Sequence, residues 1–183
     1  MRRIAIVGCS GGGKSTLALA IGKRLGLPVI HLDNLFWKPG WTESTLEEMR
    51  PKVDAAAAGE AWVIEGNFTG ASALRFARAD TVIWVEPPIW LCLWRAFARM
   101  LLAFGTTRPD LAPGCPERFD LAFYRYILSW NRVTRPKMAD ALAKVAPRAR
   151  LVRLASDEAT RAFLADLRPR HRPPDATTGD LGR

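Results

Sequence analysis

The stretch GCSGGGKST, Gly8 to Thr16, follows the apolar run RIAIV and precedes the helical pattern LALAIGKRL. It contains the spacing Gly-x-x-x-x-Gly-Lys-Ser, which is the complete Walker A pattern of phosphate-binding loops. Glycines let backbone N–H groups turn inward around an anion without a clashing Cβ, and the helix that begins near Lys14 adds its positive dipole end. The stretch therefore predicts an ATP-binding loop between a buried strand and a helix.

The polar positions of this loop have predicted roles. Lys14 bridges the outer phosphates and acts in catalysis, and the Ser15 hydroxyl ligates magnesium. The predicted nucleotide-binding residues of the loop are Gly8, Gly11, Gly12, Gly13, Lys14, Ser15 and Thr16. A nucleotide-bound magnesium also needs an acidic residue at the end of a second strand. Glu65 and Glu86 both fit, and Glu65 is preferred because Gly66 follows it and leaves room for a ligand.

The rest of the chain alternates between short apolar runs and helical patterns. The predicted strands are 2–7, 28–32, 61–65, 81–86 and 150–154, and the predicted helices are 14–25, 44–58, 88–104, 117–145 and 157–167. Such alternation favours an α/β fold with a parallel sheet covered on both faces. A capping box in STLEE, with Ser44 as its cap and Glu47 as its partner, marks one helix start, and Ser156 or Asp157 caps the last helix.

Length and composition limit the class of protein. The chain has 183 residues, which fits one domain. It has no apolar run long enough to span a membrane, and its three cysteines show neither metal-ligand spacing nor a disulfide framework. We therefore expect a cytoplasmic protein with a domain at 1–167. The segment 168–183 is rich in Pro and polar residues, so we expect a disordered basic tail.

A net charge of +9 suits anionic partners, and part of the excess is concentrated. Seven arginines between positions 95 and 135 are opposed only by Asp110, Glu117 and Asp120. The segment GTTRPDLAPGCPERFD, about 105–120, breaks helix and strand and is predicted to be a mobile excursion. Mutual repulsion of Arg99, Arg108 and Arg118 is expected to keep this segment open until an anion lies between them.

The whole pattern to about residue 167 resembles the adenylate kinase-like P-loop kinases. The stretches that carry the resemblance are GCSGGGKST, HLDNLFWKPGW, WVIEGNF, RADTVIWVEPP and RPDLAPGCPERFD. Together they are similar to the members called DNA topology modulation proteins or adenylate kinase-related kinases. The resemblance implies the P-loop nucleoside triphosphate hydrolase fold, with a sheet in the order 2-3-1-4-5. It also implies an acceptor region at about 33–60 and a lid at about 105–120 that closes over ATP.

The resemblance also assigns roles to two arginines. Arg95 and Arg99 match the R-x-x-x-R with which these kinases enter the lid, so Arg95 is expected to pack on adenine and Arg99 to meet the phosphates. A solvated helix stripe is the alternative. Adenylate kinases carry an arginine for the AMP phosphate where this chain has Thr69, so the use of AMP as acceptor stays open. Arg75 could substitute from the next helix, although its surrounding pattern does not match.

The acceptor side is marked by residues that follow the second strand. Asp33 comes just past a strand end, where open α/β sheets bind ligands, and could take the proton of an acceptor hydroxyl. The alternatives are that Asp33 caps a turn, that Trp37 and Trp41 are core residues, and that His31 only belongs to the strand. The predicted acceptor set is Asp33, Trp37, Trp41, Asn67 and Arg75.

Three functions remain open from the sequence. The first is an ATP- and magnesium-dependent phosphotransferase that acts on a nucleotide or another small acceptor. The second is a nucleic-acid-binding protein regulated by ATP, and the third is a simple ATPase. Because the chain shows no base-reading motif, any DNA affinity is expected to be weak, sequence-independent and sensitive to salt.

Overall fold

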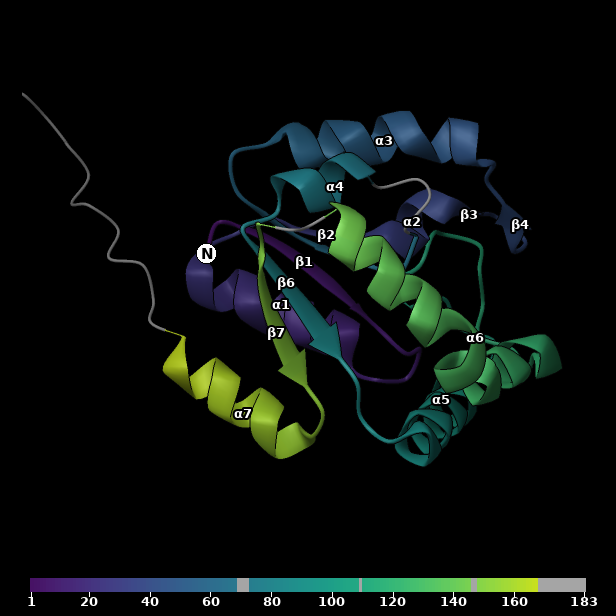
Figure 1. Cartoon of the computed structure of the whole chain (residues 1–183). Helices are drawn as coiled ribbons and strands as arrows, with labels where there is room; N and C mark the ends of the chain where they lie inside the picture. The colour runs from purple at the N-terminus through teal and green to yellow at the C-terminus, as the bar shows by residue number, and fades with distance from the viewer. Residues whose placement is uncertain (69–72, 109, 146–147, 168–183) are drawn as a thin grey trace, which may run out of the picture.

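A computed structural model of the chain describes residues 1–68, 73–108, 110–145 and 148–167. Its centre is a sheet of five parallel strands in the order β2-β5-β1-β6-β7 (Figure 1). The strands are β1 (Arg3–Gly8), β2 (Val29–His31), β5 (Trp62–Glu65), β6 (Thr81–Val85) and β7 (Arg150–Leu154). Counted along these five strands alone, the order is 2-3-1-4-5, as the resemblance to P-loop kinases implied.

The central strand shows why the sheet is covered on both faces. Ile4 and Ile6 of β1 point into one core, while Ala5 and Val7 point into the other, and all four are fully buried. A strand in which both alternating sets are apolar can only be stable between two layers of helices. The apolar run before the phosphate loop is therefore the innermost strand.

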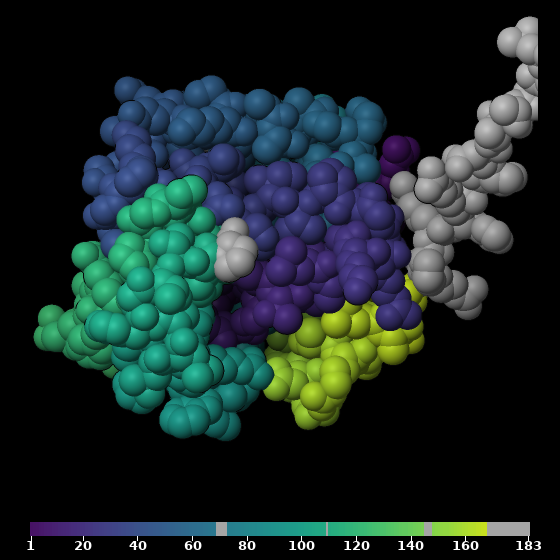
Figure 2. Space-filling model, turned by 180° about the vertical axis from the view of Figure 1, so that it is seen from behind, coloured from purple at the N-terminus to yellow at the C-terminus, as the bar shows by residue number. Residues whose placement is uncertain are grey.

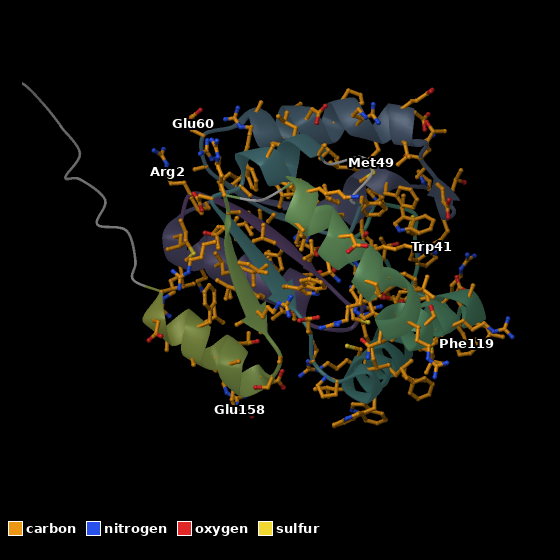
Figure 3. The ribbon with its side chains drawn as sticks, in the orientation of Figure 1. Arg2, Trp41, Met49, Glu60, Phe119 and Glu158 are labelled. Carbon is orange, nitrogen blue, oxygen red and sulfur yellow. The ribbon has the colours of Figure 1, made fainter. Side chains whose placement is uncertain are left out.

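Helices supply these two layers (Figure 1). One face packs against α1 (Lys14–Leu25) and α7 (Asp157–Asp166). The other packs against α3 (Leu46–Ala58), α4 (Ala73–Arg78), α6 (Leu121–Val145) and α5 (Ile89–Ala103). Met49 on α3 is fully buried in this second core, and Figure 3 marks its position.

Two predicted helix starts are shifted in the structure. The capping box of α3 uses Thr45 and Glu48, one residue later than predicted. The Thr45 hydroxyl accepts a hydrogen bond from the Glu48 N–H, and the Glu48 carboxylate accepts one from the Thr45 N–H. The helix predicted from residue 117 begins at Leu121. Its first turn is capped by Asp120, whose carboxylate accepts the Ala122 N–H at 2.8 Å. The last helix is capped by Ser156, one of the two predicted caps.

The acceptor region contains elements that the sequence did not predict. The short helix α2 (Leu32–Phe36) follows β2 directly, and an antiparallel pair, β3 (Trp37–Lys38) and β4 (Thr42–Glu43), follows α2. Trp41 lies in the turn of this pair with a φ of 61°. In Figure 3 it lies on the same side of the molecule as Phe119 of the lid segment.

Thr69 and the segment 168–183, which we predicted to be a disordered tail, lie outside the described residues. Among the helices that the structure describes, none has the length and apolar character needed to cross a membrane.

Candidate active site

The loop between β1 and α1 curls around its own backbone. The Gly12 N–H donates to the Cys9 carbonyl at 3.1 Å, and the Lys14 ammonium donates to the same carbonyl at 3.2 Å. The loop fits tightly against its neighbours, because a Cβ on Gly8 would lie 2.1 Å from the Val85 carbonyl oxygen. The geometry leaves the N-terminal end of α1 facing a cavity, as an anion-binding loop requires.

Behind this loop, the end of β5 brings a carboxylate to the first turn of α1. The Ser15 hydroxyl donates to Glu65 Oε1 at 3.0 Å, and His31 Nδ1 lies 2.8 Å from the same oxygen. Burial opposes ionisation of Glu65, but hydrogen bonding from His31 and the charge of Lys14 outweigh it and lower its pKa. The bond to Glu65 raises the pKa of His31.

Glu86, the other candidate for a magnesium-binding acid, lies elsewhere. Its Oε1 accepts from Arg135 Nε at 2.7 Å, and it does not belong to the described wall of the cavity. Ser15 and Glu65 together present oxygen atoms, the ligands that magnesium prefers. No group of three or more His, Cys, Asp or Glu residues within the described ranges could hold a metal alone. A magnesium ion here would therefore depend on phosphate and water oxygens as well.

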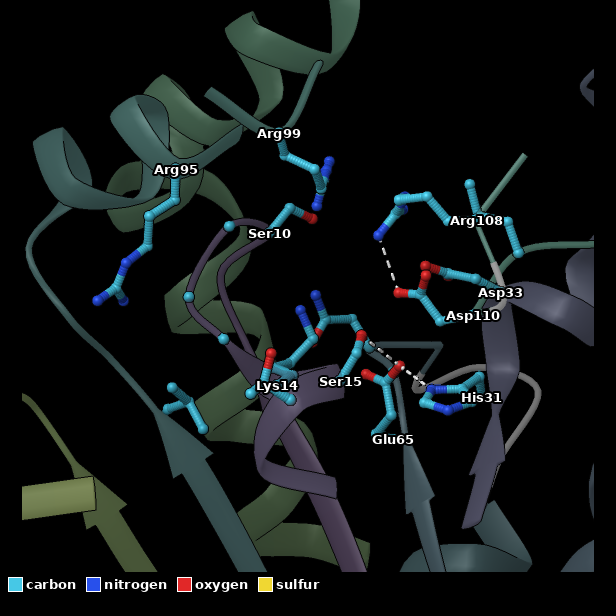
Figure 4. A pocket seen from close by; sticks show the side chains of 18 of the residues that line it. Ser10, Lys14, Ser15, His31, Asp33, Glu65, Arg95, Arg99, Arg108 and Asp110 are labelled. Atoms are coloured by element: carbon cyan, nitrogen blue, oxygen red, sulfur yellow. Dashed lines mark hydrogen bonds and ion pairs between the residues drawn. The ribbon is translucent and has the colours of Figure 1, made fainter. Parts of the chain in front are cut away.

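Asp33, in the first turn of α2, faces the same cavity from the side opposite the phosphate loop. Figure 4 shows it beside Asp110 and Arg108, across from Lys14 and Ser15. Burial and the negative charges of Glu65 and Asp110 raise the pKa of Asp33 to about 6, against the opposing charges of Lys14 and Arg108. A carboxylate with a pKa in this range is suited to accept a proton near neutral pH.

Four aromatic rings contribute to the wall of the cavity on the side of α2 and the β3–β4 pair. Phe36 packs against Phe68 and Trp37, with ring centroids 4.6 and 4.8 Å apart, and Trp37 meets Trp41 at 5.2 Å. All four side chains are only half-buried and line the cavity. The two tryptophans therefore lie where the acceptor site was predicted and are not core residues.

Asn67 and Arg75, also predicted to contact the acceptor, lie differently. Asn67 borders the cavity, but its amide binds the Gly8 N–H at 3.0 Å and the Gly8 carbonyl at 2.9 Å, so it holds the start of the phosphate loop. Arg75 is fully buried and donates to the Gly66 carbonyl at 2.9 Å. Burial lowers its pKa to about 9. Because Arg75 is enclosed beneath Gly66 and does not belong to the described cavity wall, it does not reach the predicted acceptor site in this structure.

The lid segment packs on the acceptor region. The Gly40 N–H donates to the Gly114 carbonyl at 2.8 Å, and Trp41 Nε1 donates to the Pro116 carbonyl at 2.9 Å. The repulsion expected between Arg99 and Arg108 is offset inside the chain, because the buried Glu117 carboxylate lies between them.

Arg95 lies at the end of the cavity opposite Asp33 (Figure 4). It forms an ion pair with Asp157, the first residue of α7, with Nη2 and Oδ2 2.5 Å apart. Both residues line the cavity together with Thr160 and Leu164 of α7. This end therefore lies between α5 and α7, and the resemblance to P-loop kinases implies the adenine ring here.

A single cavity is lined by the phosphate loop, Asp33, the aromatic rings and Arg95. Its volume is about 1470 Å³, which exceeds the roughly 300–1,000 Å³ of a pocket for one small ligand and leaves space for two substrates. Figure 2 shows the face on which α5 and the lid segment (teal) border α1 (purple) and α7 (yellow-green). The loop residues Lys14 and Ser15 lie between the Arg95 end and the Asp33 end.

Sequence reasoning missed several wall residues. Asp110 and Glu117 were noted only as acids that oppose the arginines. Their position in a Gly- and Pro-rich segment beside those arginines was the signal that could have identified them as site residues. Tyr126, whose hydroxyl lies 3.3 Å from Asn67 Nδ2, looked like an ordinary helix residue. Phe36 and Phe68 carried no sequence signal beyond their hydrophobicity.

The chain matches no protein-family model and no curated protein. Solved structures do match it. A shikimate kinase from Acinetobacter baumannii in complex with shikimate is 14% identical, with a TM-score of 0.53 over 90% of this chain and 89% of that chain. A shikimate kinase from Bacteroides thetaiotaomicron is 18% identical, with a TM-score of 0.52 over 90% and 94%. A sugar kinase from a Janibacter species is 15% identical, with a TM-score of 0.51 over 90% and 93%. The chain therefore has the α/β fold of the P-loop kinases.

Proposed function

We propose that this chain is an ATP- and magnesium-dependent phosphotransferase that acts on a small hydroxylated acceptor. The observation that carries the proposal is the position of Asp33, a carboxyl group with a pKa of about 6 that faces the phosphate loop across one cavity. A simple ATPase needs no carboxyl group opposite the phosphate loop and beside a set of aromatic rings. The likeness of the fold to small-molecule kinases supports the same reading.

The ATP side uses the phosphate loop and two arginines. Backbone N–H groups of the loop and Lys14 would hold the phosphates, with Arg95 beside the base and Arg99 beside the transferred group. Ser15 and Glu65 would hold magnesium, which when bound neutralises charge on the phosphates. The positive groups on this side stabilise the negative charge that spreads over the phosphoryl oxygens during transfer.

The acceptor side uses Asp33 and the aromatic rings. Asp33 would orient the acceptor hydroxyl and take its proton as the oxygen attacks phosphorus. The lid segment closes this side through its bonds to Gly40 and Trp41, which limits access of water as a competing acceptor.

The charges and rings of the acceptor side favour one chemical class of acceptor. Asp33 and Asp110 place negative charge beside the attacking position, which disfavours a second phosphate group there. The half-buried faces of Phe36, Trp37 and Trp41 suit a flat apolar surface on the acceptor. We therefore infer a neutral acceptor that combines hydroxyl groups with a ring, rather than AMP. Among the P-loop kinases that the sequence resembles, such an acceptor would distinguish this chain from the adenylate kinases.

The raised pKa of Asp33 predicts the acid side of the pH profile. Only the ionised carboxylate can accept a proton, so kcat/KM for the acceptor should fall as pH decreases through about 6, approaching about tenfold per pH unit. Transfer to the acceptor measured between pH 4.5 and 8 with the folded enzyme checks this. The Asp33→Asn enzyme should lose this limb. An unchanged limb in that variant would assign it to another group, such as His31, and would remove Asp33 as the base.

Glu65 and Glu86 provide a matched pair for the magnesium site. Glu65→Gln removes the charge beside Ser15, so the magnesium concentration for half-maximal activity should rise about 10- to 100-fold. Glu86→Gln changes the same residue type outside the cavity and should leave this value unchanged. Magnesium titrations at saturating ATP distinguish the two variants. A larger effect in Glu86→Gln would reverse the assignment.

A further inference from the structure

Glu117 is a buried carboxylate with an unusual position for a lid residue. Only 6% of the residue is exposed, yet it borders the cavity. Its Oε1 lies 2.6 Å from Arg108 Nε and 3.0 Å from Arg99 Nε, so one oxygen lies between two guanidinium groups. The carboxylate thus joins two cations that come from different parts of the chain, helix α5 and the lid segment.

The backbone fixes this carboxylate relative to α5. The Gly105 N–H donates to the Glu117 carbonyl at 2.9 Å, and the Glu117 N–H donates to the Thr106 carbonyl at 2.9 Å. Phe104 and Glu117 also form an isolated parallel bridge. Because Arg99 belongs to the last part of α5, Glu117 is tied to the end of the same helix that carries this arginine.

The contacts leave part of each arginine available. Glu117 meets both guanidinium groups at Nε, while Asp110 binds Arg108 at Nη1, 2.9 Å away. Arg99 extends toward Ser10 of the phosphate loop in Figure 4. Burial and the charge of Arg108 lower the pKa of Arg99, which shows that the two cations disfavour each other. The carboxylate between them offsets this repulsion without covering the Nη end of Arg99.

From this geometry we propose that Glu117 is a positioning residue that holds Arg99 and Arg108 together toward the transferred phosphoryl group. The proposal rests on the phosphotransferase function proposed above. Glu117 is not assigned as the base, because its Oε1 already lies between two guanidinium groups. The Glu117 carboxylate lowers the net positive charge of the site, but it also holds the two guanidinium groups in place. Glu117 therefore promotes turnover at some loss of ATP affinity.

The test compares Glu117→Gln with two controls. Gln keeps the shape but removes the charge, so Arg99 and Arg108 should separate and kcat should fall about 10- to 100-fold, as expected when charged groups are misplaced by about 1 Å. The affinity for ATP should not fall, because one negative charge has left the site; a gain of roughly threefold is expected. Glu117→Asp, which keeps the charge, should retain more kcat than Glu117→Gln. Glu158→Gln, which removes an exposed partner of Arg161 on α7, should change neither value.

Two measurements separate the outcomes. Steady-state kinetics give kcat and KM, and calorimetry with a non-hydrolysable ATP analogue gives binding even if no acceptor is turned over. A lower kcat with unchanged or tighter analogue binding supports positioning. Normal kcat, or weaker analogue binding in the Gln variant, would overturn it. If the wild-type enzyme transferred phosphate to no acceptor, the proposed function would fail. The binding of the ATP analogue by Glu117→Gln would still show how the charge of Glu117 affects ATP affinity. If Glu117→Gln does not fold, Glu117→Asp decides, and loss of ATP affinity in that variant counts against the proposal.

Discussion

The Asp33→Asn enzyme is expected to transfer phosphate about 10²–10⁴-fold more slowly than the wild type, because the amide keeps the shape but cannot accept a proton. ATP binding should hardly change, since the proposed contacts to ATP come from the phosphate loop. Hydrolysis without acceptor should also persist, because water needs no acceptor site. The fold should not weaken, since burial already disfavours the ionised form of Asp33.

Three measurements on purified enzyme check this expectation: acceptor phosphorylation, ATP affinity and background ADP release. Asp166→Asn is a suitable control, because Asp166 is an exposed aspartate at the end of α7. Normal transfer by Asp33→Asn would make Asp33 a structural residue. Loss of ATP affinity would instead place Asp33 with the magnesium ligands, and the division between an ATP side and an acceptor side would be wrong.

Lys14→Ala is expected to reduce turnover by at least about 10²–10³-fold, the loss typical for removal of one group that stabilises transition-state charge. Lys14 makes one bond, to the Cys9 carbonyl, and is only half-buried, so its removal leaves the core intact. Turnover and thermal unfolding should be measured together. Lys23→Ala, an exposed lysine on the same helix, should keep normal turnover. Near-normal turnover by Lys14→Ala would reject the role of this loop in catalysis.

The sheet and its main helices could be predicted because their signals are local. The strand before the loop is apolar at every position from Ile4 to Val7. Such a continuous apolar run is typical of a strand that is buried on both faces. The capping box was misplaced by one residue because Ser44 and Thr45 are both good caps and each has a glutamate three residues later. Only the backbone geometry distinguishes these two registers.

The arrangement of the site could be predicted only in part. Glu65 ends β5 and Asp33 lies just past the end of β2, so topology alone brings them to one edge of the sheet. The burial of Arg75 depends on how α4 packs beneath Gly66, which no local pattern encodes. Glu117 was visible as a charge but not as the partner of Arg99, because the tie between Phe104 and Glu117 joins residues across the whole lid segment.

In the proposed reaction, phosphate passes from ATP to an acceptor rather than to water. The most direct measurement follows the label from γ-labelled ATP in the presence of neutral ring-bearing hydroxyl compounds, such as nucleosides, and of the corresponding nucleoside monophosphates. We expect label on a neutral acceptor, at a rate well above the release of labelled inorganic phosphate, with the monophosphates poorer acceptors. Label found only in inorganic phosphate across both sets would contradict the account and favour an ATPase or a nucleotide-regulated binding protein.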